Sequence, residues 1–276
     1  MKKYELVLGN AKRCGNRTLY RIRCLESFSS VKKGDLGGYI ENESNLSHDG
    51  DCWVFGNAVV SDNAKVFGNA WVLNNAWVFN NAKVFDNAWV YGNAWVFDNA
   101  KVYDNASVSD FAMVNGSASV FGNAMVYDNA VVYGGAWVYG NAKVYGNAMV
   151  YDNAWVYGGA WVYGNAKVYG NATVYGNALV YGKAMVFGCT KVYGTSHIYG
   201  NAMLFEEAQV FHNASVFGCA MISNYARVCG SAKVFGDALV YGNSLVYGNA
   251  EVFGKAVLSG HDRVYGNARV SSKVNK

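Results

Sequence analysis

The hexapeptide Asn87-Ala88-Trp89-Val90-Tyr91-Gly92 decides the fold of this chain, because its pattern repeats without insertion or deletion from Asp51 to Ser272. Ala stands at the second position in 32 of these 37 units and Val at the fourth position in 33, while the fifth position is aromatic in 29. Gly-Asn or Asp-Asn mostly joins one unit to the next. A strict period of six residues over so much of the chain indicates a repeat architecture.

Positions two to five of a unit alternate small, variable, aliphatic and aromatic residues, which is the periodicity of a strand with Ala and Val on one side. The Gly-Asn or Asp-Asn pair tolerates positive φ and lets the chain turn a corner. Short strands joined by such corners do not reverse the chain, so they coil it, with three units closing a triangular turn. Parallel stacking of roughly twelve turns would give a length on the order of 60 Å. The sequence therefore predicts an all-β, single-stranded parallel β-helix over residues 51–276.

The pattern Val-Tyr-Gly-Asn-Ala-X resembles the hexapeptide repeat of left-handed parallel β-helices, in which an aliphatic residue and a small residue four positions later point inward. The stretches Gly34–Glu41, Asn45-Leu46-Ser47 and Trp53-Val54-Phe55 are further similar to the YdcK-like β-helix proteins of bacteria and their prophages. This resemblance covers nearly the whole chain and implies a left-handed solenoid. It carries little information about activity, because transferase labels in that family rest on analogy with hexapeptide acyltransferases.

Residues 1–50 do not follow the repeat. Tyr4–Leu8 and Thr18–Cys24 are typical of strands, and Gly34, Gly37 and Gly38 mark turns. Because the open end of a solenoid exposes unpaired strand edges, we expect this segment to be a small β cap over the first turn. A small docking module is the alternative, for which the basic residues are the one indication: Arg17, Arg21, Arg23, Lys32 and Lys33.

Composition narrows the function classes. The net charge is only +4 and no basic stripe is evident, so we expect no nucleic-acid partner. The N-terminus lacks the apolar core of a signal peptide and no apolar run is long enough to span a membrane, which predicts a cytoplasmic protein without a membrane partner. The six cysteines have no metal-ligand spacing, so we expect free thiols, no metal and no cofactor.

The third position of each unit points outward, and residues 18 apart fall into one column. The first and third columns mix charged and aromatic residues. The second column is apolar except for Lys167 and holds the candidate self-association face: Trp77, Trp95, Met113, Met149, Met185, Met203 and Met221. Such a face predicts a homo-oligomer, a dimer or trimer, because a soluble monomer rarely exposes so large an apolar patch. The alternative is that these side chains only stabilise one another along the column.

A second candidate is the start of the first column. Trp53, Trp71 and Trp89 stand one above another and could stack against sugar rings as a carbohydrate-binding surface. An aromatic ladder without a ligand is the alternative. Binding to an unidentified protein partner is also compatible with the pattern.

Catalysis is not expected. The 37 units pass without an inserted loop that could form a lid or pocket, and the chain has only four histidines: His48, His197, His212 and His261. The sequence therefore predicts a non-catalytic, self-associating scaffold or protein-binding surface, compatible with prophage origin. Two alternatives stay open: an acyltransferase-like hexapeptide enzyme with an unrecognised or degenerate site, and an aromatic-lined carbohydrate-binding rod.

Overall fold

The computed structural model describes residues 2–272 and divides the chain into two compact units, Met1–Gly135 and Ala136–Lys276. We call them the N-terminal unit and the C-terminal unit and describe each by itself. Within the described residues both units are built from strands, with one short 3-10 helix in the N-terminal unit. Residues 273–276, the end of the predicted β-helix segment, lie outside the described residues.

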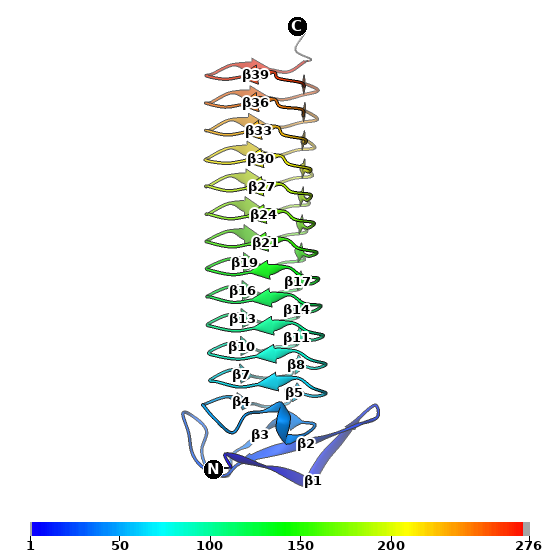
Figure 1. Cartoon of the computed structure of the whole chain (residues 1–276), viewed down its shortest axis with the longest axis vertical. Coiled ribbons are helices and arrows are strands. Elements are labelled where there is room, and N and C mark those ends of the chain that lie inside the picture. Colours follow the sequence, from blue (N-terminus) through cyan, green and yellow to red (C-terminus); the bar gives the residue numbers. More distant parts are fainter. Residues whose placement is uncertain (1, 273–276) are drawn as a thin grey trace. The chain divides into compact units, whose positions relative to one another are not determined.

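Each hexapeptide forms a two-residue strand from its third and fourth positions and then a corner (Figure 1). The strands are shorter than the four residues predicted, because the fifth position already leads into the corner. Only the sixth position takes positive φ, as at Gly92 with 72° and Asp98 with 60°. The chain passes through three sheets in turn, so each strand pairs in parallel with the strand 18 residues away, for example Trp71 with Trp89. The predicted parallel β-solenoid is confirmed.

The N-terminal unit has three such sheets, named first, second and third after the columns of the sequence. The first contains β4 (Trp53–Val54), β7 (Trp71–Val72), β10 (Trp89–Val90), β13 (Ser107–Val108) and β16 (Met125–Val126). The second contains β5 (Val59–Val60), β8 (Trp77–Val78), β11 (Trp95–Val96), β14 (Met113–Val114) and β17 (Val131–Val132). The third contains β6 (Lys65–Val66), β9 (Lys83–Val84), β12 (Lys101–Val102) and β15 (Ser119–Val120).

The C-terminal unit repeats the arrangement. Its first sheet contains β19 (Lys143–Val144), β22 (Trp161–Val162), β25 (Leu179–Val180), β28 (His197–Ile198), β31 (Ser215–Val216), β34 (Lys233–Val234), β37 (Glu251–Val252) and β40 (Arg269–Val270). Its second contains β20 (Met149–Val150), β23 (Lys167–Val168), β26 (Met185–Val186), β29 (Met203–Leu204), β32 (Met221–Ile222), β35 (Leu239–Val240) and β38 (Val257–Leu258). Its third contains β18 (Trp137–Val138), β21 (Trp155–Val156), β24 (Thr173–Val174), β27 (Lys191–Val192), β30 (Gln209–Val210), β33 (Arg227–Val228), β36 (Leu245–Val246) and β39 (Arg263–Val264).

The interior of each unit is filled by Ala at the second position and Val at the fourth, nearly all of them fully buried. Their small size fits a narrow triangular interior without voids. Backbone groups are satisfied between coils, as where the Trp89 N–H donates to the Ala106 carbonyl at 2.9 Å. Where a hydroxyl replaces an inner Ala it finds a local partner: Ser244 Oγ donates to the Tyr241 carbonyl at 2.7 Å. A polar atom in the core is therefore compensated.

The corners are held by ladders of small polar residues. A Cβ added to Gly92 would lie 2.8 Å from the backbone nitrogen of Asp110, so glycine suits both the left-handed φ and the close approach of the next coil. Asp98 tolerates the same conformation and accepts a hydrogen bond from the Gly116 N–H at 3.2 Å. At the first position the amides bond to one another, as from Asn69 Nδ2 to Asn87 Oδ1 at 3.1 Å.

Aromatic residues at the fifth position stack in register. The rings of Tyr163 and Tyr181 are 4.9 Å apart and nearly parallel, and Tyr181 stacks on Tyr199 in the same way. The separation equals the spacing of adjacent strands, so the fold itself imposes the stacking. Such aromatic pairs add stabilisation beyond the area that they bury.

The N-terminal cap extends the second sheet of its unit. β1 (Tyr4–Cys14) and β2 (Arg17–Cys24) form an antiparallel hairpin, and β2 pairs with β3 (Leu36–Ile40), which runs parallel to β5. The strands predicted at residues 4–8 and 18–24 are thus present and longer. A parallel bridge between Leu46 and Val66 shows that the first coil begins before residue 51, the predicted boundary.

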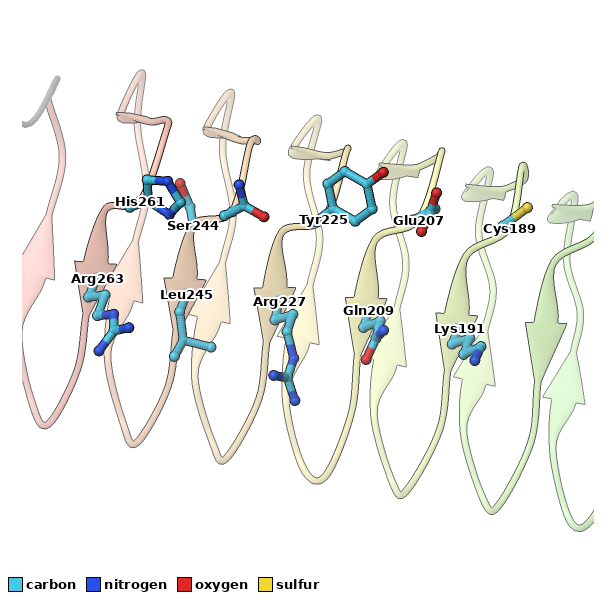
Figure 2. A pocket seen from close by; sticks show the side chains of 11 residues that line it. Cys189, Lys191, Glu207, Gln209, Tyr225, Arg227, Ser244, Leu245, His261 and Arg263 are labelled. Atoms are coloured by element: carbon cyan, nitrogen blue, oxygen red, sulfur yellow. The ribbon is translucent and has the colours of Figure 1, made fainter.

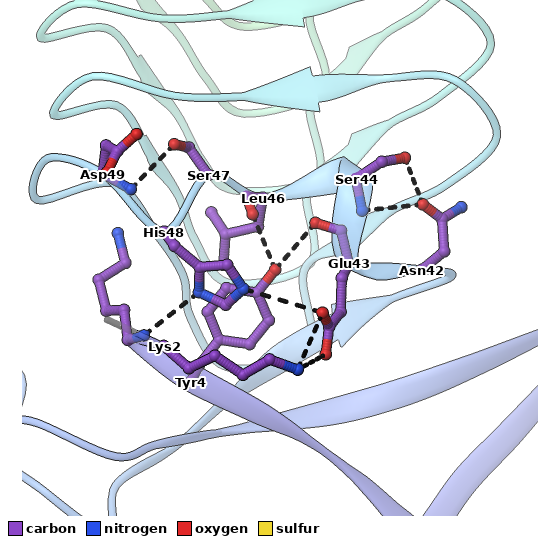
Figure 3. Close-up of polar contacts among 10 residues, drawn as sticks. Lys2, Tyr4, Asn42, Glu43, Ser44, Leu46, Ser47, His48 and Asp49 are labelled. Atoms are coloured by element: carbon purple, nitrogen blue, oxygen red, sulfur yellow. Dashed lines mark hydrogen bonds and ion pairs between the residues drawn. The ribbon is translucent and has the colours of Figure 1, made fainter.

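Polar contacts fasten the cap to the first coil (Figure 3). The Tyr4 hydroxyl donates to the Leu46 carbonyl at 2.7 Å, next to the 3-10 helix η1 (Glu43–Asn45). Lys3 is only 7% exposed, and its ammonium donates to the Gly50 and Cys52 carbonyls at 2.9 Å each. Burial raises the pKa of Tyr4, with the Glu43 carboxylate adding to the shift, so the phenol stays a donor. Among the described residues there is no helix with the length and apolar character needed to cross a membrane.

Candidate functional site

The second sheet of the N-terminal unit carries an apolar groove. Its walls are Trp77, Trp95, Phe111 and Met113, and it is framed by Asn75, Asn93 and Asn129, with a volume of about 530 Å³. Phe111 is 60% exposed, Trp95 45% and Met113 36%. The rings of Trp77 and Trp95 lie 6.3 Å apart and are tilted by 33°, and the ring of Phe79 packs edge-on to Trp95 at 6.1 Å. The lining of this groove includes no charged side chain.

The corresponding positions of the second sheet in the C-terminal unit are also mostly apolar but less exposed. Met149, Met185, Met203 and Met221 are each half-buried, and Lys167 between the first two is exposed. Met185 and Met203 are direct neighbours across β26 and β29, as are Met203 and Met221 across β29 and β32. The apolar character predicted for this column is present in both units, and its most exposed apolar side chains belong to the N-terminal unit.

Trp53, the first residue of the predicted tryptophan column, is not accessible to a ligand. Trp53 is 1% exposed, because the cap covers it: the rings of Phe28 and Tyr4 pack edge-on against it at 5.5 and 6.1 Å. No ligand can therefore stack on Trp53 in this fold, which corrects the expectation of a three-membered platform. Trp71 and Trp89 remain stacked on each other at 5.3 Å, with Trp89 exposed.

A second, polar groove of about 740 Å³ lies on the C-terminal unit (Figure 2). Figure 2 shows that two parallel rows of side chains form it. One row comes from the third position of the third sheet: Lys191, Gln209, Arg227, Leu245 and Arg263. The other comes mainly from the corner before that sheet: Cys189, Glu207, Tyr225, Asn243, Ser244 and His261. Both rows run from coil to coil, across the direction of the strands.

The charges of the polar groove are unpaired. Within residues 2–272, no ion pair or hydrogen bond involves the ammonium of Lys191, the guanidinium of Arg263 or the carboxylate of Glu207. The Arg227 guanidinium lies over the ring of Phe211, 5.2 Å from its centroid. Three cations thus face one carboxylate, and the groove has an excess of positive charge.

Neither Phe111 nor the corner row of the polar groove was among the predicted sites. The sequence does contain a signal for both, at the first position of the hexapeptide, where Asn is the rule. Phe111 replaces it beside the apolar groove, and Cys189, Glu207, Tyr225 and His261 replace it along the polar groove. A search for departures from the repeat at the corners, in place of columns at the third position alone, would have found them.

The remaining titratable groups considered as site residues, His48 and the cysteines, lie in surroundings that indicate a structural role. His48 stacks on Tyr4 with ring centroids 4.3 Å apart, and burial lowers its pKa despite Glu43 nearby. The six cysteines are free, and burial raises the pKa of the Cys52, Cys24 and Cys229 thiols, which makes them poor nucleophiles. In the part of the chain that the structure describes, no three His, Cys, Asp or Glu side chains cluster as metal ligands would.

Comparison with known families agrees with the fold. A family model described as the YdcK beta solenoid repeat matches residues 118–134, 124–140, 142–158 and 166–182. All four stretches lie inside the unbroken hexapeptide register. The resemblance that the sequence pattern indicated is thereby confirmed for the repeats. No curated protein matches the chain.

Proposed function

We propose that this chain, a YdcK-type β-solenoid repeat protein, is a non-catalytic scaffold that associates with a second copy of itself through the second sheet of its N-terminal unit. The observation that carries the proposal is the apolar groove of Trp77, Trp95, Phe111 and Met113. Trp, Phe and Met are the residue types enriched in the cores of protein interfaces.

The lack of charge favours a second copy as the occupant. In a two-fold symmetric interface the same patch meets itself, so any net charge on it would be repelled. The apolar groove satisfies this condition, since its lining is aromatic, thioether and amide. The amides of Asn75, Asn93 and Asn129 at its edge can supply the polar rim that such interfaces have.

The non-catalytic part of the proposal rests on regularity. From Asp51 to Ser272 no residue is inserted between hexapeptides, so no lid or closing loop interrupts the coils there. A rigid repeat that presents only outward columns of side chains is suited to act as a scaffold. The absence of heat on titration with acetyl-CoA would agree with this, whereas saturable binding would favour the acyltransferase-like alternative.

Substitutions that use the repeat's own residues test the proposal. Lys at the third position and Asn at the first already occur in neighbouring coils, so the double variant Trp95→Lys, Phe111→Asn should fold normally. We expect light scattering coupled to size-exclusion chromatography to show a dimer for the unmodified chain at micromolar concentration and a monomer for the double variant.

The matched control is Trp89→Lys, because Trp89 is equally exposed but lies on the first sheet. This variant should stay dimeric. A monomer for the unmodified chain, or equal loss of association in the control, would contradict self-association through this groove.

A further inference from the structure

The corner that borders the polar groove departs from the repeat in a confined stretch. In the preceding coils of the C-terminal unit the first position there is Asn153 and then Asn171. It then becomes Cys189, Glu207, Tyr225, Asn243 and His261, of which only one keeps the amide. Elsewhere such amides bond to one another from coil to coil, as Asn249 does with Asn267. In this stretch, varied side chains replace the amides that would bond to one another, and all of these side chains are exposed.

The cations of the groove have a regular spacing. Lys191, Arg227 and Arg263 stand on alternate coils of the third sheet, separated by Gln209 and Leu245. Adjacent coils are one strand spacing apart, so neighbouring cations are about 10 Å apart at their Cα atoms. Their row therefore suits a linear ligand that runs along the stack of coils and carries a negative charge at intervals of that order.

The same spacing argues against a nucleic acid. One strand of a duplex carries a charge every ~3.4 Å along its axis, several times denser than this row, and the groove also contains the carboxylate of Glu207. The two rings among the lining residues, the phenol of Tyr225 and the imidazole of His261, stand two coils apart, whereas single-strand binders use successive stacking platforms.

An acidic peptide has no backbone partner here. The N–H groups of Lys191, Gln209 and Arg227 already donate to the carbonyls of the next coil, at 2.9 to 3.0 Å. No free strand edge faces the groove between these coils, so a peptide could not add a strand.

The other lining residues match a sugar chain. The ring of Tyr225, 57% exposed, sits between Glu207 and His261 in the corner row (Figure 2) and offers a face for the C–H groups of a pyranose. Gln209, Asn243 and His261 present planar groups that donate and accept hydrogen bonds, as sugar hydroxyls require. The cations can pair with carboxylates on the sugars.

We propose that this groove binds a linear acidic polysaccharide whose carboxylates recur about every second sugar. Lys191, Arg227 and Arg263 take the carboxylates, and Tyr225 stacks against a sugar ring between two of them. The binding is independent of self-association, which uses an apolar groove on the N-terminal unit.

The test is isothermal titration at low ionic strength with hyaluronan hexasaccharide, which carries a carboxylate on every second sugar. Neutral chitohexaose, hexaglutamate and the hexanucleotide of thymidine are the comparison probes. We expect measurable affinity for the hyaluronan fragment alone, weakening as salt is added. Absence of binding at millimolar hyaluronan fragment, or tighter binding of the peptide or the nucleotide, would overturn the proposal.

Variants locate the site. Replacing Lys191, Arg227 and Arg263 together by Gln, the residue already present at position 209, should weaken binding at least about tenfold, since each exposed charge contact contributes modestly. Tyr225→Asn, which restores the usual corner residue, should weaken it less.

The control removes the same charge from the first sheet of the same unit: Lys143, Lys233 and Arg269 replaced by Gln. It should bind the hyaluronan fragment within about twofold of the unmodified chain, because these residues lie outside the groove. Equal loss in the control would show attraction to net charge only and refute a site at the groove.

Discussion

Two columns of the C-terminal unit pass through the same coils and have opposite electrostatic outcomes. On the first sheet, Glu251 stands between Lys233 and Arg269 and pairs with both, at 3.9 and 3.0 Å. On the third sheet, Leu245 stands between Arg227 and Arg263, and neither guanidinium has a carboxylate partner among residues 2–272. The scaffold beneath is the same in both places. The outward side chain of each coil therefore determines whether the cations of a column are paired with a carboxylate or remain available to a ligand.

The largest loss of stability should come from substitutions in the buried interior beneath the two columns. Val228 and Val234 are fully buried beside Arg227 and Lys233. Replacing either by Asp would place a carboxylate in the interior, which should cost at least about 3 kcal/mol of unfolding free energy. Urea denaturation followed by circular dichroism would measure both. Similar losses are expected, and a markedly smaller loss under one column would mean that the two interiors differ.

The next test converts one column into the other. Leu245→Glu would place a carboxylate between Arg227 and Arg263, as Glu251 is placed on the first sheet. If the groove binds acidic sugars, the affinity for the hyaluronan fragment should fall about tenfold or more, because the cations are then paired and an anion repels the ligand. Titration calorimetry would show the change, and Leu245→Gln is the uncharged control. Unchanged affinity in the Glu variant would break the comparison.

The reverse exchange should be smaller. Glu251→Leu would leave Lys233 and Arg269 without a partner, and both are more than half exposed. Exposed pairs contribute little, so the free energy of unfolding should fall by less than about 1 kcal/mol. The difference should shrink at high salt, which a denaturation series at two ionic strengths would reveal. A salt-independent loss would point to packing by the Glu251 methylenes in place of charge.

The smallest effect concerns an ion pair that titrates, in the cap of the N-terminal unit. His48 lies 4.0 Å from Glu43, yet burial outweighs this attraction and lowers its pKa below 6.5. Protonation thus favours the unfolded cap, so His48 contributes stability above pH 6.5 that is lost as the pH falls through the lowered pKa. Relative to the intrinsic exchange rate at each pH, hydrogen exchange in residues 2–50 should quicken over this range, and less so in His48→Gln. The Lys233–Glu251–Arg269 column should show no change there.

The six-residue period of the sequence was enough to predict the coils, because every inner Ala and Val has the same local role in its hexapeptide. Trp53 shows where that reasoning ends. From the third to the sixth position its hexapeptide, Trp53-Val54-Phe55-Gly56, follows the repeat, but Phe28 and Tyr4, far away in the sequence and outside any repeat, bury Trp53. The topology of the cap depends on such pairings between distant segments, as between Tyr4 and Cys24. No periodic signal encodes them.

The candidate site shows a similar limit. Met113 and Trp95 could be assigned to one face from spacing alone, and the structure places them side by side across β11 and β14. Glu207 and Tyr225 could be assigned to a corner, but that the corner and the third sheet together border a groove depends on side-chain directions. The spacing predicts which residues align along the coils, while the hollow between two rows follows only from their three-dimensional arrangement.

The 18-residue pairing register has a consequence for how such a gene can change. Loss or duplication of a single hexapeptide would leave every inner Ala and Val facing inward, so the coils beyond it in the same unit would still form. All the outward residues after that point, however, would move on to the next sheet, and a groove that spans the change would be cut apart. Only changes by whole coils preserve the surface. The unbroken hexapeptide register of this chain therefore preserves the arrangement of its outward side chains more than the packing of its interior.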